Sequence, residues 1–323
     1  MREVWLPSRV ERVSAWADGP VYAQDEQSIG GFGSRGGFQQ YMSRENGEVL
    51  LCALAQGRAL VLNGESCLLV VDGERTLAQA PALLPQGTEV LEARTCDGAR
   101  VVLLTAQKPG GRCSLETRYG FVVLGPVGVD GKLAAVQAIQ AGWATLPRAW
   151  AVDGHAGTLV AQSEAGSAEF LQFHLETGEA SEARRLPVDS RPGEGGVGVV
   201  GLDVSPGLGW TALEVHSGAS AELRLLPPAR QRTAPLVLPL TTNGGAAPKW
   251  SLSGDCCLYR NGSGLGGAVW AVHAAAGPPA TPILLRAVEP DMPVCWCQGG
   301  RFVAIGAGDA VAVAPIPPAG ALS

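Results

Sequence analysis

The stretch SRENGEVLLCALAQGRALVLNGESCLLVVDG, from Ser43 to Gly73, decides how this sequence is interpreted. It holds three apolar runs, VLLCAL, ALVL and CLLVV, and segments that contain glycine separate them. Apolar residues do not recur at helical spacing here. Short apolar runs between glycine-containing turns are typical of antiparallel strands. The stretch therefore predicts a small sheet of neighbouring strands.

The same alternation recurs along the chain. Successive units carry a turn glycine, and these glycines lie 46 to 56 residues apart: Gly47, Gly98, Gly154, Gly207, Gly254 and Gly300. A repeat of this length with about four short strands is typical of a β-propeller blade. One four-stranded sheet cannot cover both of its faces, whereas blades packed side by side cover one another. The period therefore predicts an all-β chain that folds as a β-propeller of four-stranded antiparallel blades.

Some repeats resemble those of WD-repeat propellers. EFLQFHLETGE, residues 169–179, is similar to the third strand of such a repeat and the turn that follows it. AVWAVHAAAG has Trp270 at the place of the tryptophan in the Trp-Asp pair, with Ala271 in place of the aspartate. PKWSLSGDCCLYR is equally similar to the repeats of TolB-type and lactonase-type propellers. The resemblance covers roughly residues 43–316 and implies the fold, although Gly-His and Trp-Asp pairs are missing from nearly every unit.

The two ends of the chain set the number of blades. AWADGPVYAQ, residues 15–24, parallels AWAVDGHAGTLVAQ, residues 149–162, and indicates a further, shorter blade at the start. The last unit supplies only about three strands, so we expect REVWLPSRVERV to complete it by pairing near residues 311–314. These features predict seven blades, with six as the alternative, closed by the N-terminal strand.

The domain organisation follows from this count. We expect one β-propeller domain over residues 1–323. The short first blade and the ring-closing strand occupy residues 1–42, the repeated blades residues 43–316, and a tail residues 317–323.

Composition and charge disfavour two classes of partner. The chain has 323 residues and a formal net charge of -6, so it offers no excess of basic residues to neutralise a phosphate backbone. We therefore expect no nucleic-acid partner. No run of about 18 apolar residues is present, so we expect no membrane span.

The cysteines and the N-terminal sequence indicate the compartment. Most of the eight cysteines stand inside apolar runs, without any C-x-x-C pair, as small buried hydrophobic residues do. The start, MREVWLPSRVERV, lacks the apolar segment of a secretory signal. We expect reduced thiols in an intracellular, cytoplasmic protein; removal of a leader peptide is the alternative.

The stretch GGFGSRGGF, residues 30–38, contains the pattern G-x-G-x-x-G at Gly31, Gly33 and Gly36. A dinucleotide site needs a buried strand before this pattern and a helix after it. The preceding YAQDEQSI is polar, and Asn46-Gly47 interrupts any helix that follows. We therefore expect no cofactor and interpret the stretch as a connector between the first blade and the first full blade. Phe32 and Phe38 would anchor it, and Arg35 would be exposed at its tip.

Three histidines form the candidate set for a metal ion. His174 and His273 occupy matching places near the end of third strands, and His216 stands near the end of a second strand. With Asp203 or Asp255 they offer imidazole and carboxylate ligands that suit a divalent ion. Packing shared by all repeats explains matching positions equally well, so we expect no metal and keep these histidines as the alternative. Ser251 and Ser253 beside Asp255 are interpreted as hydrogen-bonding residues of a turn.

No set of residues in the sequence converges on a known catalytic pattern. We therefore expect a non-enzymatic propeller that binds other proteins as a scaffold, as a subunit of a multi-subunit assembly. A lactonase-like or metal-dependent hydrolase, or a ligand-binding propeller that uses the central channel, is the alternative. Arginines in the long loops are the expected interaction residues: Arg35, Arg112, Arg118, Arg191, Arg230 and Arg232.

Overall fold

The structure is a computed structural model of the chain. It describes residues 1–80, 84, 87–95, 97–108, 117–128, 130–133, 136–153, 157–162, 169–181, 184–185, 197–218, 220–228, 230–231, 233–241, 247–262, 267–274, 281–287 and 292–318. Within these residues, the strands form seven four-stranded antiparallel sheets, which are the seven blades of a β-propeller. The predicted fold class and blade number are confirmed.

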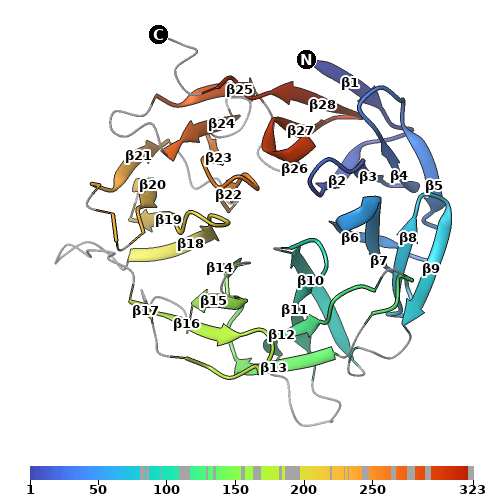
Figure 1. Ribbon diagram of the computed structural model, residues 1–323, viewed down its shortest axis with the longest axis horizontal. Helices are drawn as coiled ribbons and strands as arrows, with labels where there is room; N and C mark the ends of the chain where they lie inside the picture. The colour runs from blue at the N-terminus through green and yellow to red at the C-terminus, as the bar shows by residue number, and fades with distance from the viewer. Residues whose placement is uncertain are drawn as a thin grey trace. The chain divides into compact units, whose positions relative to one another are not determined.

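The chain divides into two compact units. The first consists of Met1–Thr145, Glu176–Gly178 and Met292–Pro315, and the second of Leu146–Leu175, Glu179–Asp291 and Ile316–Ser323. Four blades lie in the first unit and three in the second. Figure 1 labels the strands of these blades.

The first unit holds blades 1, 2, 3 and 7. Blade 1 comprises β2 (Val10–Ala15), β3 (Val21–Asp25), β4 (Ser28–Phe32) and β5 (Gln39–Ser43). Blade 2 comprises β6 (Val49–Leu54), β7 (Arg58–Leu62), β8 (Leu68–Asp72) and β9 (Arg75–Ala80), with a 3-10 turn, η1 (Ala55–Gly57), after β6. Blade 3 comprises β10 (Thr88–Thr95), β11 (Val101–Gln107), β12 (Arg118–Leu124) and β13 (Val136–Trp143). Blade 7 comprises β26 (Val294–Cys297), β27 (Phe302–Ala307), β28 (Ala310–Pro315) and β1 (Arg2–Trp5), with η4 (Gln298–Gly300) after β26.

The second unit holds blades 4, 5 and 6. Blade 4 comprises β14 (Trp150–Asp153), β15 (Thr158–Gln162), β16 (Glu169–His174) and β17 (Arg184–Arg185). Blade 5 comprises β18 (Val197–Val204), β19 (Thr211–Ser217), β20 (Ser220–Leu226) and β21 (Leu236–Leu240). Blade 6 comprises β22 (Lys249–Trp250), β23 (Cys256–Asn261), β24 (Ala268–His273) and β25 (Ile283–Ala287).

The N-terminal strand completes the last blade of the chain. β1 runs antiparallel to β28, with Arg2 opposite Val313 and Val4 opposite Val311. The pairing near residues 311–314 is confirmed, but only Arg2–Trp5 of the stretch REVWLPSRVERV takes part in it, because residues from Val10 onward form β2 of blade 1. The pairing gives β28 a neighbour on its outer side, so its backbone groups do not remain an open edge.

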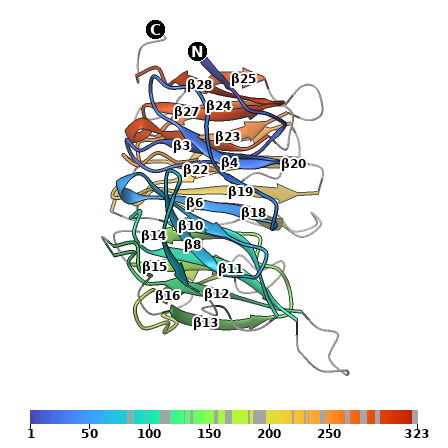
Figure 2. The ribbon, with the colours of Figure 1, turned by 90° about the vertical axis from the view of Figure 1, so that its right-hand side faces the viewer.

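The first blade is complete, which corrects the expectation of a shorter one. β2 to β5 form a full four-stranded sheet, and Figure 2 shows β3 and β4 lying side by side within it. Sequence patterns under-represent this blade because β4 (SIGGF) contains two glycines and β5 (QQYMS) is polar. β5 is mostly exposed, so its side chains do not need to be apolar.

The turn glycines are also not all equivalent. Gly98, Gly207, Gly254 and Gly300 follow the first strand of their blades, whereas Gly47 lies in the connection from β5 to β6. In blade 2 the equivalent turn is η1, which ends at Gly57.

The core lies between neighbouring blades of each unit. Within the first unit, blades 7 and 1 share one apolar cluster, and blades 1 and 2 share another. Within the second unit, blades 4 and 5 and blades 5 and 6 are joined in the same way. Six of the described cysteines are buried and have free thiols: Cys52, Cys67, Cys256, Cys257, Cys295 and Cys297. Cys96 and Cys113 lie outside the described residues.

Candidate functional site

The stretch GGFGSRGGF lies inside blade 1. Its first residues belong to β4, residues 33–38 form the loop to β5, and no helix follows. A Cβ on Gly30 would lie 2.2 Å from the carbonyl oxygen of Gln39, and one on Gly31 would lie 2.9 Å from the Tyr41 ring. The glycines at 30 and 31 therefore allow β4 to approach β5. We expected the stretch to connect two blades. The structure instead places it within blade 1, where it forms the end of β4 and the loop to β5.

An arginine of the closing strand holds this loop. The Arg2 guanidinium donates hydrogen bonds to the carbonyl oxygens of Gly33, Ser34 and Gly36, the first over 3.2 Å. Among the described residues, no carboxylate lies within ion-pair distance of Arg2. The carbonyls thus fix the guanidinium and leave its charge without a counter-ion.

A groove lies beside this loop, between blades 7 and 1 of the first unit. It encloses about 550 Å³. Its apolar floor consists of Val21 and Phe32 from blade 1 and Val313 and Phe302 from blade 7. The first three of these side chains are almost wholly buried, so the floor is part of the core between the two blades.

The rim of the groove is polar. Arg2 stands on one side, and Asp18 and Gln298 stand among the other lining residues. Asp18 already has a counter-ion, because its carboxylate lies 3.4 Å from the guanidinium of Arg301. An apolar floor with a few polar groups at its edge is the usual composition of a binding site, and the volume lies within the typical range of about 300–1,000 Å³.

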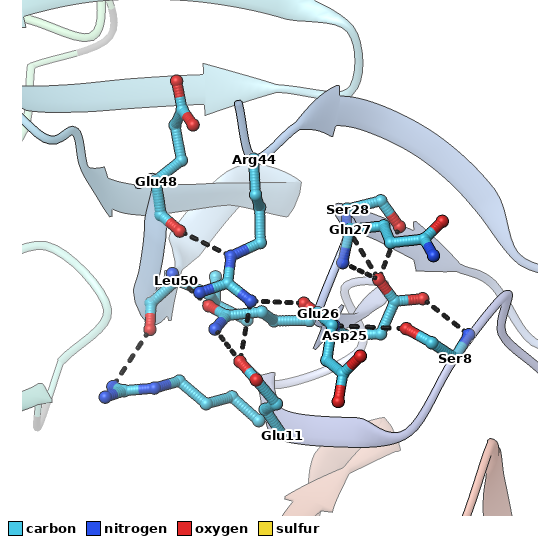
Figure 3. A network of polar contacts seen from close by, with 11 residues as sticks. Ser8, Glu11, Asp25, Glu26, Gln27, Ser28, Arg44, Glu48 and Leu50 are labelled. Atoms are coloured by element: carbon cyan, nitrogen blue, oxygen red, sulfur yellow. Dashed lines mark hydrogen bonds and ion pairs between the residues drawn. The ribbon is translucent and has the colours of Figure 1, made fainter. Parts of the chain in front are cut away.

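The opposite edge of blade 1 carries a network of polar contacts centred on Arg44 (Figure 3). The Arg44 guanidinium donates to the Glu11 carboxylate over 2.7 Å, to the Glu48 carbonyl over 2.8 Å and to the Asp25 carbonyl. Figure 3 shows Arg44 reaching between the start of β2 and the segment that enters β6. One side chain thereby connects blade 1 to blade 2.

Two further residues complete this connection. Gln24 donates to Glu11 over 2.7 Å and accepts a hydrogen bond from the Leu50 amide over 2.7 Å. Because Glu11 and Leu50 belong to the first strands of neighbouring blades, the amide of Gln24 couples those strands.

The Asp25 carboxylate organises the turn between β3 and β4. It accepts hydrogen bonds from the amides of Ser8, Gln27 and Ser28, and from the Ser28 hydroxyl, over 2.7–3.2 Å. Asp25 is fully buried, so these donors replace the water that a carboxylate otherwise needs. The network is satisfied within the protein, and we assign it to the framework rather than to binding.

Of the arginines predicted as interaction residues, the structure describes Arg35, Arg118 and Arg230. Arg35 is exposed in the loop beside the groove, Arg118 is exposed at the start of β12, and Arg230 is exposed after β20. Arg118 has interactions within the protein. The remaining predicted positions, Arg112, Arg191 and Arg232, lie outside the described residues.

Two histidines of the alternative metal set, His216 and His273, have different partners. The Nε2 of His216 lies 2.8 Å from the Glu214 carboxylate, and the Nε2 of His273 donates to the Pro317 carbonyl over 3.0 Å. His174 is exposed at the end of β16. In the part of the chain that the structure describes, no group of three or more His, Cys, Asp or Glu side chains is placed to hold a metal ion.

The two aspartates considered with these histidines serve turns and strand ends. Asp203 accepts a hydrogen bond from the Trp250 amide over 2.7 Å. Asp255 accepts from the hydroxyls of Ser251, over 3.0 Å, and Ser253. The interpretation of Ser251, Ser253 and Asp255 as a hydrogen-bonded turn is confirmed.

The groove itself was not found by sequence reasoning. Arg2 was expected only as part of the closing strand, and Phe32 only as an anchor of the connector. Arg2 and Phe32 are 30 residues apart and belong to no common sequence motif. They lie near each other because β1 pairs with a strand from the end of the chain, in the blade next to blade 1. Trp150, Trp250 and Trp296, which begin or belong to first strands, are buried, whereas Trp5 is 64% exposed.

Fold and site together define a β-propeller with a groove between adjacent blades of its first unit. No family model matches the chain, and no curated protein matches it. Solved structures match it at low identity. A chain from the crystal structure of a Mitotic Checkpoint Complex has a TM-score of 0.62 and 11% identity, over 98% of this chain and 91% of that one.

Two further solved structures are similar. PorZ, a bacterial surface component of the type-IX secretion system of Porphyromonas gingivalis, has a TM-score of 0.56 and 13% identity, over 98% of this chain and 39% of that one. The WD40 domain of SCAP from fission yeast has a TM-score of 0.49 and 10% identity, over 97% of this chain and 98% of that one. Among the described residues, no helix has the length and apolar character needed to cross a membrane.

Proposed function

We propose that this chain is a non-enzymatic β-propeller that binds other proteins as a subunit of a larger assembly. The groove between blades 7 and 1 carries the proposal, because it combines an apolar floor, a charged rim and a rigid framework. The similar propeller in the Mitotic Checkpoint Complex is, by its description, part of an assembly. The six buried cysteines without a disulfide support a location inside the cell.

The exposed arginines in the loops contribute to binding in this proposal. Arginine offers a planar set of donors to carboxylates and is enriched where interfaces gain most of their energy. We place Arg35, Arg118 and Arg230 in this role. We assign the same role to Arg112, Arg191 and Arg232 by their position in the sequence.

Affinity purification from the native source, followed by mass spectrometry, tests the proposal. We expect at least one protein to co-purify in stoichiometric amounts with the tagged chain. Replacement of Arg35, Arg118 and Arg230 by glutamate should reduce its recovery. Replacement of Arg75, an exposed arginine on the outer strand of blade 2, is the matched control and should not.

Two results would contradict the proposal. One is the absence of any stoichiometric partner from native extract. The other is a stoichiometric divalent ion in the purified protein whose removal by a chelator abolishes a hydrolytic activity, since that would favour the hydrolase alternative.

A further inference from the structure

We propose that the groove between blades 7 and 1 binds an extended acidic peptide segment of the partner, with an apolar side chain on the floor and a neighbouring carboxylate at Arg2. The inference rests on the proposed function, because it takes the partner to be a protein. It adds the site and the chemistry of the segment that is bound.

The apolar floor sets the first requirement. Phe32, Val21 and Val313 are each at most 9% exposed, yet all three line the hollow. Phe302 lines it too and is only partly buried. An apolar side chain placed there would remove the remaining apolar surface from water, at about 25 cal/mol per Å². A leucine, phenylalanine or methionine suits this floor, whereas a charged side chain would lose its hydration without gaining a partner.

The charges at the rim set the second requirement. Arg2 lines the groove, Arg35 stands exposed on the loop beside it, and neither has a carboxylate partner among the described residues. Asp18, the acidic residue among the described residues that line the groove, is paired with Arg301. The rim therefore has an excess of positive charge, although the whole chain has a net charge of -6. A carboxylate complements this rim.

Arg2 is prepared for such a carboxylate. Its guanidinium already donates to carbonyl oxygens of the loop, to that of Gly33 over 3.2 Å, so part of its side-chain freedom is lost before a ligand binds. Carbonyl oxygens orient the guanidinium but do not neutralise its positive charge. A carboxylate forms a charge-assisted hydrogen bond with it that is stronger than the bond to a neutral carbonyl.

Selection from a phage-displayed library of random ten-residue peptides, on the immobilised full chain, tests the proposal. We expect the enriched peptides to carry Asp or Glu within two positions of a large apolar residue. A synthetic copy of the most enriched peptide, labelled with fluorescein, then serves as the probe for affinity measurements by fluorescence anisotropy.

Three variants separate charge from shape. Ser34→Trp should fill the groove and abolish binding of the probe, whereas Gln79→Trp, which puts an exposed tryptophan on β9, should not. Arg2→Gln should weaken binding about tenfold and remove most of its salt dependence. Arg2→Lys keeps the charge, so it should retain the salt dependence even if the loop shifts. Circular dichroism on each variant verifies that it is folded.

Several outcomes would overturn the proposal: no enrichment over an unrelated immobilised protein, enrichment of basic peptides, or a probe whose affinity is unchanged by Ser34→Trp. These outcomes differ from a failure of the proposed function. If a native partner co-purifies equally with wild type and Ser34→Trp, the chain binds proteins but not through this groove. If no partner co-purifies at all, the proposed function fails.

Discussion

At the scale of single residues, the glycines of GGFGSRGGF have different roles. Gly30 lies where a Cβ would meet the Gln39 carbonyl at 2.2 Å and the Phe38 ring at 2.6 Å. Gly30 precedes the pattern G-x-G-x-x-G. Within the pattern, a Cβ at Gly31 would lie 2.9 Å from the Tyr41 ring, whereas nothing lies within 4 Å of a Cβ at Gly33 or Gly36. The stretch thus combines positions that require glycine with positions that do not.

This contrast gives a matched pair of substitutions. Gly30→Ala should lower the free energy of unfolding by about 2 kcal/mol, because overpacking forces backbone and ring apart. Gly33→Ala should change it by less than about 0.5 kcal/mol. Thermal and urea denaturation measure both, and equal effects of the two substitutions would contradict this account of the loop.

The buried carboxyl group of Glu214, which lies 2.8 Å from the Nε2 of His216, gives the stability a pH dependence. Burial raises the pKa of Glu214, and the hydrogen bond and charge of His216 only partly oppose it. A raised pKa means that the folded protein binds this proton more tightly than the unfolded chain. The contribution of Glu214 to stability is therefore present below about pH 4.3 and is lost as the pH rises through the native pKa.

Glu214→Gln removes this titration. The stability of the variant relative to wild type should therefore increase between pH 4 and neutral pH. Denaturation curves at a series of pH values measure the difference, and a difference that is constant or decreases with pH would show that this pKa is not raised.

At the scale of elements, closure by β1 depends on one face of the strand. Val4 is 4% exposed and packs in the cluster between blades 7 and 1, whereas the next residue, Trp5, is 64% exposed. Side chains alternate between the two faces of a strand, so neighbours in sequence have opposite environments.

Val4→Asp should therefore lower the free energy of unfolding by more than about 3 kcal/mol, because it buries a charge without a partner. Trp5→Ser should cost less than about 1 kcal/mol and is the control. Hydrogen exchange of the β28 amides should accelerate in Val4→Asp alone. If both variants were equally stable, β1 would not be needed to close the blade.

At the scale of the whole molecule, packing between blades protects the thiols. Burial raises the pKa of Cys52, Cys256 and Cys297 to about 12 in each case. Only the thiolate reacts readily, so these groups should be unreactive while the blades are packed.

Treatment of the native protein with a thiol reagent at pH 8, followed by intact-mass measurement, tests this protection. At most Cys96 and Cys113 should react in the folded protein, and all eight cysteines should react after denaturation. Rapid labelling of a third cysteine in the native protein would mean that one of the described cores opens easily.

The sequence by itself determined the fold, because strand length, turn glycines and the repeat period are local properties. Short apolar runs such as VLLCAL between glycine turns are typical of strands, and their period predicted the blades and seven as their number, with six as the alternative. The sequence also predicted closure by REVWLPSRVERV, of which the structure uses Arg2–Trp5. The prediction of a shorter first blade was wrong because two of its strands lack an apolar run. In β4 two glycines replace apolar residues, and β5 is mostly exposed and polar.

Only the tertiary structure decided the candidate site. The groove needs Arg2, Phe32 and Val313 together. The pairing of β1 with β28 and the packing of blade 7 on blade 1 place these three residues along one groove. No local sequence pattern predicts this groove. Arg2 and the apolar floor form a site only after segments that are distant in sequence lie side by side in the fold. The role of the glycine-rich loop beside the groove also depends on the tertiary structure, because Arg2 from β1 donates hydrogen bonds to its carbonyl oxygens.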